Sequence, residues 1–267
     1  MTAPVVCCDL DGVIWRGDEP IAGAAEGIAV LRAAGRRVVF VTNNSSGTRA
    51  EYVAKLESCG VPVDPADVLS SAMAAARLLA VGLAPGARVL SYAGPGVHEA
   101  LGAAGFQPVE ELPVDAVVAG FHRDFDFDRL AVAADAVRAG ARFVATNVDA
   151  TYPTASGLVP GTGALVAALE VASGRRAEVA GKPHAPMAAL VREVCGPDGV
   201  MIGDRPSSDG VFAVALGWPF ALVLSGIAGT HGEEPVPDPP PEFVAADLGA
   251  LAPQLLEAAQ AAGPRSR

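Results

Sequence analysis

The segment Val5-Val-Cys-Cys-Asp9-Leu-Asp11-Gly12 joins a short apolar run to two closely spaced acids. The apolar run predicts a buried strand over Val5–Leu10. Two carboxylates directly after such a strand repel each other and lose solvation, and a divalent cation or a proton would relieve that repulsion. Asp-x-Asp-Gly is also a common turn sequence, so this segment alone leaves a purely structural role open.

This segment begins a pattern that repeats along the chain. Each repeat has a short apolar run, a polar loop and an Ala- and Leu-rich helical stretch. Such alternation predicts a parallel sheet covered by helices, in which ligands bind at the carboxyl ends of the strands. The predicted strands are Val5–Leu10, Arg37–Val41, Arg88–Tyr92, Ala116–Phe121, Arg142–Thr146, Gly199–Ile202, Phe220–Leu224 and Phe243–Ala246. The predicted helices include Ala24–Ala34, Thr48–Ser58, Ser70–Ala80, Ser207–Leu216 and Leu251–Ala259.

The pattern is interrupted once, at Gly82-Leu-Ala-Pro-Gly86. A second series of strands and helices follows this break, and the last third of the chain returns to the first rhythm. We therefore predict an α/β fold in which a Rossmann-like parallel-sheet core, residues 1–81 and 179–267, carries an inserted α/β domain over residues 82–178.

The composition and net charge of the chain limit the kinds of molecule that it can bind. Of the 267 residues, 51% are hydrophobic and 18% charged, which supports a sizeable core and excludes disorder of the whole chain. The net charge of -11 disfavours binding to nucleic acid or to an anionic membrane. No apolar stretch approaches the roughly 20 residues of a spanning helix. Met1-Thr-Ala-Pro4 lacks a basic segment and the four cysteines match no metal or redox spacing, so we expect a cytoplasmic protein.

Polar side chains follow two further apolar segments. Thr42-Asn43-Asn44-Ser45-Ser46 places a hydroxyl and two amides at a strand end, where they can bind an oxyanion, although the same residues also suit a helix N-cap loop. In Gly181-Lys182-Pro183 the glycine and the proline favour a fixed turn with a placed cation, whereas an isolated lysine is usually a solvated surface charge.

A third acidic cluster, Gly203-Asp204-Arg-Pro-Ser-Ser-Asp209, follows the predicted strand Gly199–Ile202. Asp204 supplies another carboxylate at a strand end. Asp209 falls near a helix start, where an acid is also favourable for the helix dipole alone.

These pieces form one chemical set. Asp9, Asp11 and Asp204 supply hard oxygen ligands of the kind that Mg²⁺ prefers. Thr42, Asn44 and Lys182 supply hydrogen-bond donors and a positive charge. The set predicts metal-assisted attack on a phosphate.

The four motifs, in this order, resemble the haloacid dehalogenase superfamily, and within it the NagD-like, 4-nitrophenylphosphatase-type branch. The resemblance runs from about Val5 to Gly226 and implies an inserted cap domain of the C2 type. It further implies a Mg²⁺-dependent phosphomonoesterase that acts through an aspartyl-phosphate on a small phosphorylated metabolite. We slightly prefer glycerol 3-phosphate or 2-phosphoglycolate, while sugar phosphates, nucleoside monophosphates and pyridoxal phosphate stay open.

The resemblance assigns roles to single residues. Asp9 is expected to be the nucleophile and Asp11 the general acid and base, with its carbonyl on the metal. The metal set is expected to be Asp9, Asp11, Asp204 and Asp209. The expected phosphate-binding residues are Thr42, Asn43, Asn44 and Lys182, of which Lys182 is also counted as catalytic. The segment Val13–Pro20 resembles the hairpin-like flap beside the nucleophile.

The resemblance also assigns substrate specificity to the cap, through Arg123, Asp124 and Phe125 on one loop and Asn147 and Asp149 on another. By analogy, the chain is expected to form a homodimer. Two other functions compete with the phosphatase. A non-catalytic phosphometabolite sensor would not need both Asp9 and Asp11, and a dehalogenase would not need the metal set.

Overall fold

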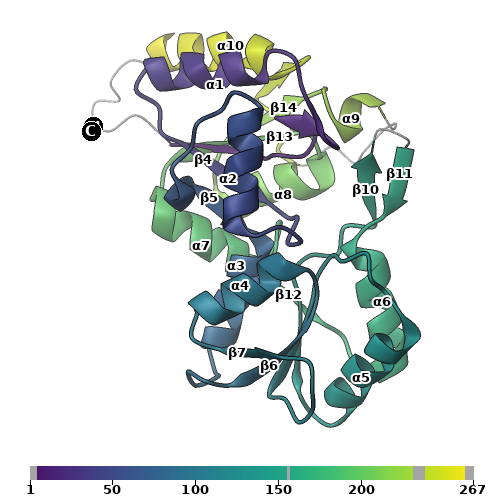
Figure 1. Cartoon of the computed structure of the whole chain (residues 1–267). Coiled ribbons are helices and arrows are strands. Elements are labelled where there is room, and N and C mark those ends of the chain that lie inside the picture. Colours follow the sequence, from purple (N-terminus) through teal and green to yellow (C-terminus); the bar gives the residue numbers. More distant parts are fainter. Residues whose placement is uncertain (1–4, 155–156, 231–237, 262–267) are drawn as a thin grey trace. The chain divides into compact units, whose positions relative to one another are not determined.

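The computed structural model describes residues 5–154, 157–230 and 238–261, and strands and helices alternate along them (Figure 1). The strands are β1 (Val5–Cys8), β2 (Trp15–Arg16), β3 (Glu19–Pro20), β4 (Val38–Thr42), β5 (Val68–Ser70), β6 (Arg88–Tyr92), β7 (Gln107–Val109), β8 (Ala116–Ala119), β9 (Arg142–Ala145), β10 (Thr151–Thr154), β11 (Gly157–Pro160), β12 (Glu178–Val179), β13 (Gly199–Gly203), β14 (Phe220–Val223) and β15 (Phe243–Ala245). The helices are α1 (Ala24–Ala33), α2 (Arg49–Ser58), α3 (Ser71–Ala80), α4 (Pro95–Ala103), α5 (Phe127–Arg138), α6 (Thr162–Ser173), α7 (Ala185–Cys195), α8 (Val211–Leu216), α9 (Ile227–Thr230) and α10 (Leu248–Ala261). This order confirms the predicted α/β class.

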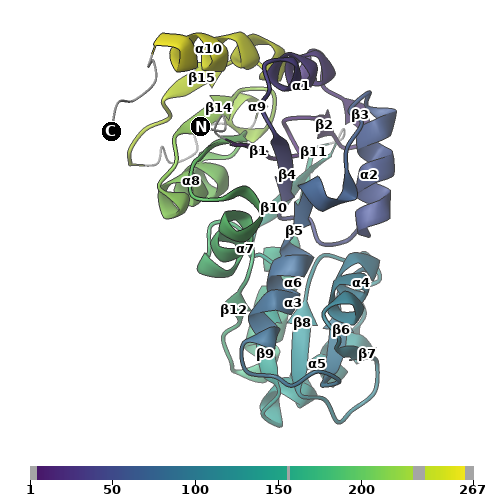
Figure 2. The same ribbon diagram turned by 90° about the vertical axis from the view of Figure 1, so that its left-hand side faces the viewer.

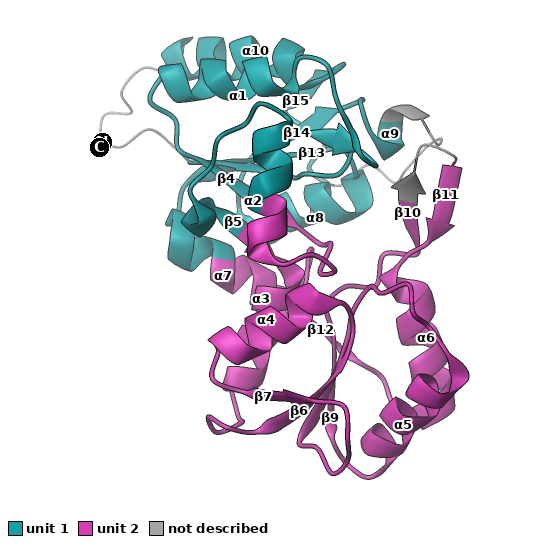
Figure 3. Ribbon diagram, in the orientation of Figure 1, with its two compact units in different colours: residues 1–41, 53–68, 191–267 teal, residues 42–52, 69–190 magenta. Residues whose placement is uncertain are grey.

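The chain divides into two compact units, which are coloured separately in Figure 3. The first unit contains residues 1–41, 53–68 and 191–267, and the second contains residues 42–52 and 69–190. The predicted inserted domain, residues 82–178, lies within the range of the second unit. Its exact boundaries stay a prediction, because parts of the predicted core also belong to the second unit.

The first unit is built on a sheet with the strand order β15-β14-β13-β1-β4-β5. Strand β1 runs parallel to β13 on one side and to β4 on the other, so that Cys7 lies opposite both Met201 and Val39. All of β4 and the last three residues of β1 are buried. The chain leaves β1 towards β4 and β5 and later fills the other side with β13, β14 and β15. The strand order therefore reverses at β1 and β13, which is where open parallel sheets bind ligands.

An early helix and a late helix of the chain pack together in this unit. Helices α1 and α10 pack against each other, the first purple and the second yellow in Figures 1 and 2. The buried residues of α1 are Ala24, Gly27, Ile28 and Leu31, spaced three and four apart as expected for one helix face.

The second unit has its own parallel sheet, with the strand order β12-β9-β8-β6-β7. Helix α3 packs with α4 and helix α5 packs with α6 (Figure 1). The side chains of β6, β8 and β9 bury a core with α5 and α6 that includes Tyr92, Val117, Phe143 and Leu169. Strands β10 and β11 form a separate antiparallel pair.

The predicted elements are present, with shifted ends and one larger difference. The helix predicted over Ser207–Leu216 begins only at Val211, because Pro206–Gly210 form a wide turn of the π type. Gly210 is a poor helix former and ends that turn. The hairpin expected over Val13–Pro20 is confirmed, since Trp15 pairs with Pro20 across β2 and β3.

Among the described residues, no helix is both long enough and apolar enough to cross a membrane. All four cysteines are free thiols, and the Sγ atoms of Cys7 and Cys195 lie 3.7 Å apart. Residues Met1–Pro4, on which the expectation of no secretory signal rests, lie outside the described residues.

Candidate active site

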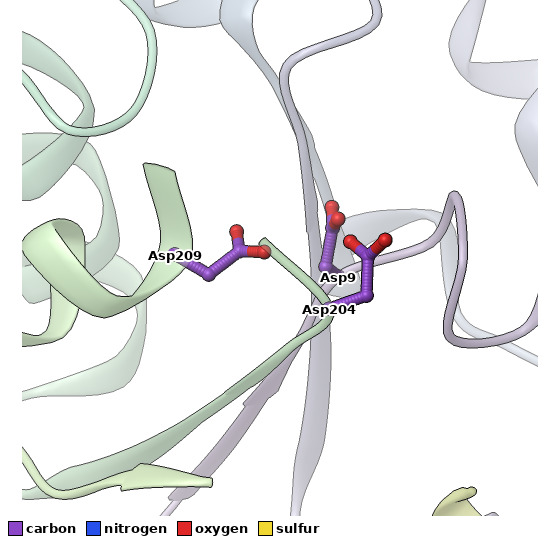
Figure 4. A group of neighbouring side chains, drawn as sticks. All are labelled: Asp9, Asp204 and Asp209. Atoms are coloured by element: carbon purple, nitrogen blue, oxygen red, sulfur yellow. The ribbon is translucent and has the colours of Figure 1, made fainter. Parts of the chain in front are cut away.

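Three carboxylates gather at the switch point of the first sheet. Asp9 follows β1 and Asp204 follows β13, while Asp209 lies in the turn Pro206–Gly210 (Figure 4). Each offers an oxygen that lies within 4.8 Å of the others, and all three residues are buried. The parallel pairing explains the meeting of Asp9 and Asp204, because Cys8 lies opposite Ile202 and the Asp9 N–H donates to the Ile202 carbonyl at 2.9 Å.

Glycines make room for these carboxylates. A Cβ atom at Gly12 or at Gly226 would overlap the carboxylate of Asp204. Gly12 also has a φ of 84°, a conformation that favours glycine. The glycine in Asp-x-Asp-Gly is therefore required by the site itself and not only by a turn.

Backbone and indole groups orient the acids. The Ile227 N–H donates to Asp204 Oδ2 at 2.6 Å, and the Arg205 N–H donates to Asp209 Oδ2 at 3.1 Å. The Asp11 carboxylate lies outside the group of three, and its Oδ1 accepts the Trp15 Nε1–H at 2.9 Å. Asp204, Asp209 and Asp11 are thus each held by a donor from the first unit.

The second unit contains a cluster of buried amides centred on Asn43. Its Oδ1 accepts the Lys182 N–H at 2.8 Å, and its Nδ2 donates to the Lys182 carbonyl at 3.0 Å. The same Nδ2 lies 3.0 Å from Asp149 Oδ2, and Asn147 Nδ2 donates to the Asn43 carbonyl at 2.7 Å. The structure thus brings together predicted residues that are more than 100 positions apart in the sequence. The amide of Asn43 is engaged in holding the Lys182 backbone.

The loop that begins at Thr42 has the local bonds of a capped turn. The Asn44 N–H donates to Thr42 Oγ1 at 3.0 Å, and Ser46 donates to Asn44 Oδ1 through its N–H at 3.1 Å and its hydroxyl at 2.7 Å. Tyr52 fixes the Asn44 carbonyl through a hydrogen bond of 2.8 Å. These bonds make the loop rigid, and its phosphate-binding role stays a prediction.

Lys182 is 3% exposed, so the alternative of a solvated surface charge is wrong. Nearby, burial lowers the pKa of His184, which is therefore neutral at pH 7. Of these two basic residues, Lys182 is the one that brings a positive charge to the Gly181–His184 turn.

The cap residues predicted from the resemblance lie in the second unit but do not form one group. Asn147 and Asp149 surround Asn43, as described above. Arg123 and Phe125 are exposed on the loop after β8. Asp124 is bound to His122 Nδ1 in the same loop and to Arg129 of α5. Burial raises its pKa, but the hydrogen bond of its own backbone, followed by His122 and Arg129, lowers the pKa overall. Their part in specificity stays a prediction.

Some functional groups were missed from the sequence. The Ser225–Ile227 segment follows β14 directly; its Ser225 hydroxyl donates to the Gly12 carbonyl at 2.7 Å, and its Ile227 N–H holds Asp204. Applying the strand-end rule to Phe220–Leu224 would have indicated this segment. The bond from Trp15 to Asp11 had no comparable signal.

The carboxylate group fits a divalent metal ion. Its ligand atoms are all hard oxygens, its residues are buried, and such a group is destabilised by charge repulsion unless a cation accompanies it. Asp9, Asp204 and Asp209 are therefore the residues that would hold Mg²⁺. The Asp11 carbonyl, which the resemblance implies as a further ligand, stays a prediction.

Comparison with known proteins agrees with this fold and this donor set. Residues 6–107 match the family described as haloacid dehalogenase-like hydrolase, and residues 179–251 match one described as HAD-hydrolase-like. The chain belongs to the haloacid dehalogenase superfamily.

Its relatives include named phosphatases. A D-glycerol 3-phosphate phosphatase of Mycobacterium tuberculosis is 43% identical over 82% of this chain and 62% of its own length, so the chain spans less than two thirds of that relative. A glycerol-3-phosphate phosphatase of Gallus gallus is 35% identical over 82% of this chain and 79% of its own. An acid sugar phosphatase of Staphylococcus aureus is 33% identical over 82% and 86%.

Solved structures agree. A glycerol phosphate phosphatase of M. tuberculosis in complex with magnesium superposes with a TM-score of 0.83 at 37% identity, covering 93% of this chain and 76% of that one. The p-nitrophenyl phosphatase of Archaeoglobus fulgidus gives a TM-score of 0.82 at 29% identity, covering 93% and 98%. These neighbours confirm the predicted branch of the superfamily.

The space that Gly226 leaves for the Asp204 carboxylate can be tested by measuring Mg²⁺ binding. Gly226→Ala should displace the Asp204 carboxylate and weaken Mg²⁺ binding roughly 10- to 100-fold, the usual cost of disturbing a ligand's support. The measurement is a Mg²⁺ titration followed by thermal unfolding. Gly102→Ala is the control, since a Cβ there meets nothing within 4 Å. Equal Mg²⁺ affinity in both variants would show that the glycine is not needed for the metal site.

Proposed function

We propose that the chain is a Mg²⁺-dependent phosphomonoesterase that hydrolyses a small phosphorylated metabolite. The observation that carries the proposal is the group of Asp9, Asp204 and Asp209, three buried acids at a sheet switch point with Asp11 beside them. Such a group is costly in a purely structural role. Membership of a hydrolase superfamily whose sampled relatives are named phosphatases supports the same reaction.

The proposed reaction has two steps. The Asp9 carboxylate attacks phosphorus, the bond to the substrate oxygen breaks, and Asp11 gives its proton to the departing alkoxide. Asp11 then takes a proton from water, whose oxygen attacks the aspartyl-phosphate, releasing phosphate and restoring Asp9. Bound Mg²⁺ would offset the repulsion between the acids and the anionic phosphate.

Lys182, Thr42 and Asn44 are the proposed phosphate-binding residues. Strand β4 pairs with β1 through Phe40 and carries Thr42 two residues further along. Lys182 supplies a buried positive charge, which is worth more against developing negative charge than a solvated one. Asn43 positions Lys182 through both backbone groups, and the phosphate contact predicted for Asn43 stays a prediction.

For the substrate, we propose a short-chain phosphate, with glycerol 3-phosphate first and 2-phosphoglycolate second. The names of the M. tuberculosis and G. gallus relatives support glycerol 3-phosphate, and the S. aureus relative keeps sugar phosphates open. A cytoplasmic location, which the free thiols support, and a homodimer belong to the same proposal as expectations.

The reaction is tested by phosphate release from a panel of small phosphomonoesters, with Mg²⁺ and with EDTA. Release should need Mg²⁺, should be fastest for glycerol 3-phosphate or 2-phosphoglycolate, and should fall below about one per cent in Asp9→Asn. No release from any compound by folded, Mg²⁺-saturated protein would favour the sensor. Phosphate release that persists in EDTA would contradict the metal-assisted mechanism.

Lys182 is tested by Lys182→Met, which keeps the length of the side chain and removes its charge. We expect kcat/KM to fall roughly 10²- to 10³-fold, because the buried charge acts on the transition state. Arg175→Met is the matched control, since it removes a positive charge from an exposed position. If the two variants lose the same small amount, the effect is one of net charge and Lys182 has no special role.

The indole of Trp15 is tested by Trp15→Phe. An aromatic ring is kept, although a smaller one, and the donor to Asp11 is lost, so the proton-transfer group is less well oriented and kcat should fall about tenfold with little change in KM. The control is Trp218→Phe, which removes an indole hydrogen bond of 2.6 Å to the Pro197 carbonyl elsewhere in the first unit. Trp218→Phe should lower the melting temperature and leave kcat unchanged. A normal kcat in Trp15→Phe would remove the positioning role.

A further inference from the structure

Two thiols lie in contact inside the first unit. The Sγ atoms of Cys7 and Cys195 are 3.7 Å apart, although the two residues are separated by 188 positions in the sequence. Cys7 is buried in β1, while Cys195, the last residue of α7, is partly exposed. The sulfur atoms of a disulfide bond lie about 2.0 Å apart. An approach of about 1.7 Å would therefore join the two cysteines.

The structure allows this approach on the side of Cys195. Cys7 is held in place, because β1 pairs with β13 and with β4 at that residue. Cys195 ends a helix, and Gly196 follows it with a φ of 85° in open space, where an added Cβ would meet nothing within 4 Å. The end of a helix yields more readily than a central strand. We therefore expect the adjustment at the end of α7 and not in β1.

The surroundings of Cys195 favour its thiolate. A hydrogen bond with Cys7 and, after it, the positive charge of Arg37 lower the pKa of Cys195, against the opposing effects of burial and of Asp67. Arg37 is fixed next to Cys195, since its Nη1 donates to the Val194 carbonyl at 2.8 Å. The thiolate is the form that reacts with oxidants, and Cys195 is the more accessible of the two cysteines. Oxidation should therefore begin at Cys195.

A bond between these cysteines would join two distant parts of the chain. The first unit is assembled from residues 1–41, 53–68 and 191–267, and residues 69–190 of the second unit come between the last two of these segments. Cys7 belongs to the first segment and Cys195 to the third. A cross-link that closes so long a loop reduces the conformational entropy of the unfolded chain, and it thereby stabilises the folded one.

We propose that Cys7 and Cys195 are a site of reversible oxidation by peroxide, at which they form a disulfide bond that stabilises the first unit. The modification does not depend on the phosphatase reaction. In a reducing compartment the bond would form during exposure to peroxide and would be reversed by a dithiol reductant.

The oxidation takes two steps. The Cys195 sulfur attacks hydrogen peroxide, so that an S–O bond forms, the O–O bond breaks, and the departing hydroxide becomes water with the proton that Cys195 has given up. The Cys7 sulfur then attacks the sulfenic acid of Cys195. The S–S bond forms, the S–O bond breaks, and the departing hydroxide takes the Cys7 proton and leaves as water. The two thiols are oxidised and the peroxide is reduced.

The test compares the full chain after treatment with dithiothreitol and after treatment with hydrogen peroxide, with the remaining thiols then blocked by N-ethylmaleimide in denaturant. The oxidised chain should carry two blocked thiols in place of four. Tandem mass spectrometry should join Cys195 to Cys7 and not to Cys8, whose side chain points to the opposite face of β1. The melting temperature of the oxidised chain should be roughly 5–10 °C higher, and dithiothreitol should reverse the change.

Cys195→Ser separates the bond from other effects of peroxide. Peroxide should leave all three remaining thiols of this variant open to blocking and should not raise its melting temperature. Cys59→Ser is the matched control, because Cys59 directly follows α2, is also partly exposed, and should not be needed for the bond.

Four outcomes would overturn the proposal. Peroxide could leave all four thiols of the folded chain open to blocking, or it could convert Cys195 to a sulfinic acid without any cross-link. The bond could form without a rise in melting temperature. Lastly, Cys195→Ser could gain as much stability from peroxide as Cys59→Ser does.

Discussion

Electrostatic repulsion between the carboxylates of Asp9, Asp204 and Asp209 is the physical constraint that the rest of the first unit has to satisfy. These three buried carboxylates have oxygens within 4.8 Å of one another, and each additional negative charge there raises the cost of burying the others. Strand pairing forces the first two together, since β1 and β13 are parallel neighbours that end at the same edge. A divalent cation or a proton relieves this repulsion, and the proposed chemistry uses Mg²⁺ in that place.

Other residues of the first unit make room for the buried carboxylates and stabilise their charge. Gly12 and Gly226 leave space for the Asp204 carboxylate, while the Ile227 and Arg205 N–H groups stabilise its charge and that of Asp209. These hydrogen bonds compensate part of the solvation that the two carboxylates lose on burial, but they do not neutralise the negative charge. The site therefore keeps a net negative charge when empty, which favours a metal ion over a bound anion.

The buried strands of the first unit and the acids that follow them could be predicted from the sequence, because both depend on local patterns. The apolar runs that precede Asp9 and Asp204 identify buried strands, and the strand-end rule makes those acids candidate ligands. Strand β7 escaped prediction since Gln107-Pro-Val is short and contains proline, a residue that donates no ladder hydrogen bond. The role of Asn43 could not be inferred, because its amide partners lie 106 and 139 residues away. An Asn at a strand end looks the same whether it contacts a ligand or fixes a backbone.

The two sheets follow one topological rule. Each reverses its strand order next to its central strand, and each places polar groups where the rule expects a ligand. The whole chain carries a charge of -11, so a phosphate monoester is repelled at long range and must be captured by short-range contacts. The chain has two lysines, and one of them, Lys182, is buried and fixed through its backbone by Asn43. The burial and fixing of this one lysine are explained if its positive charge is needed at one point in an otherwise acidic protein.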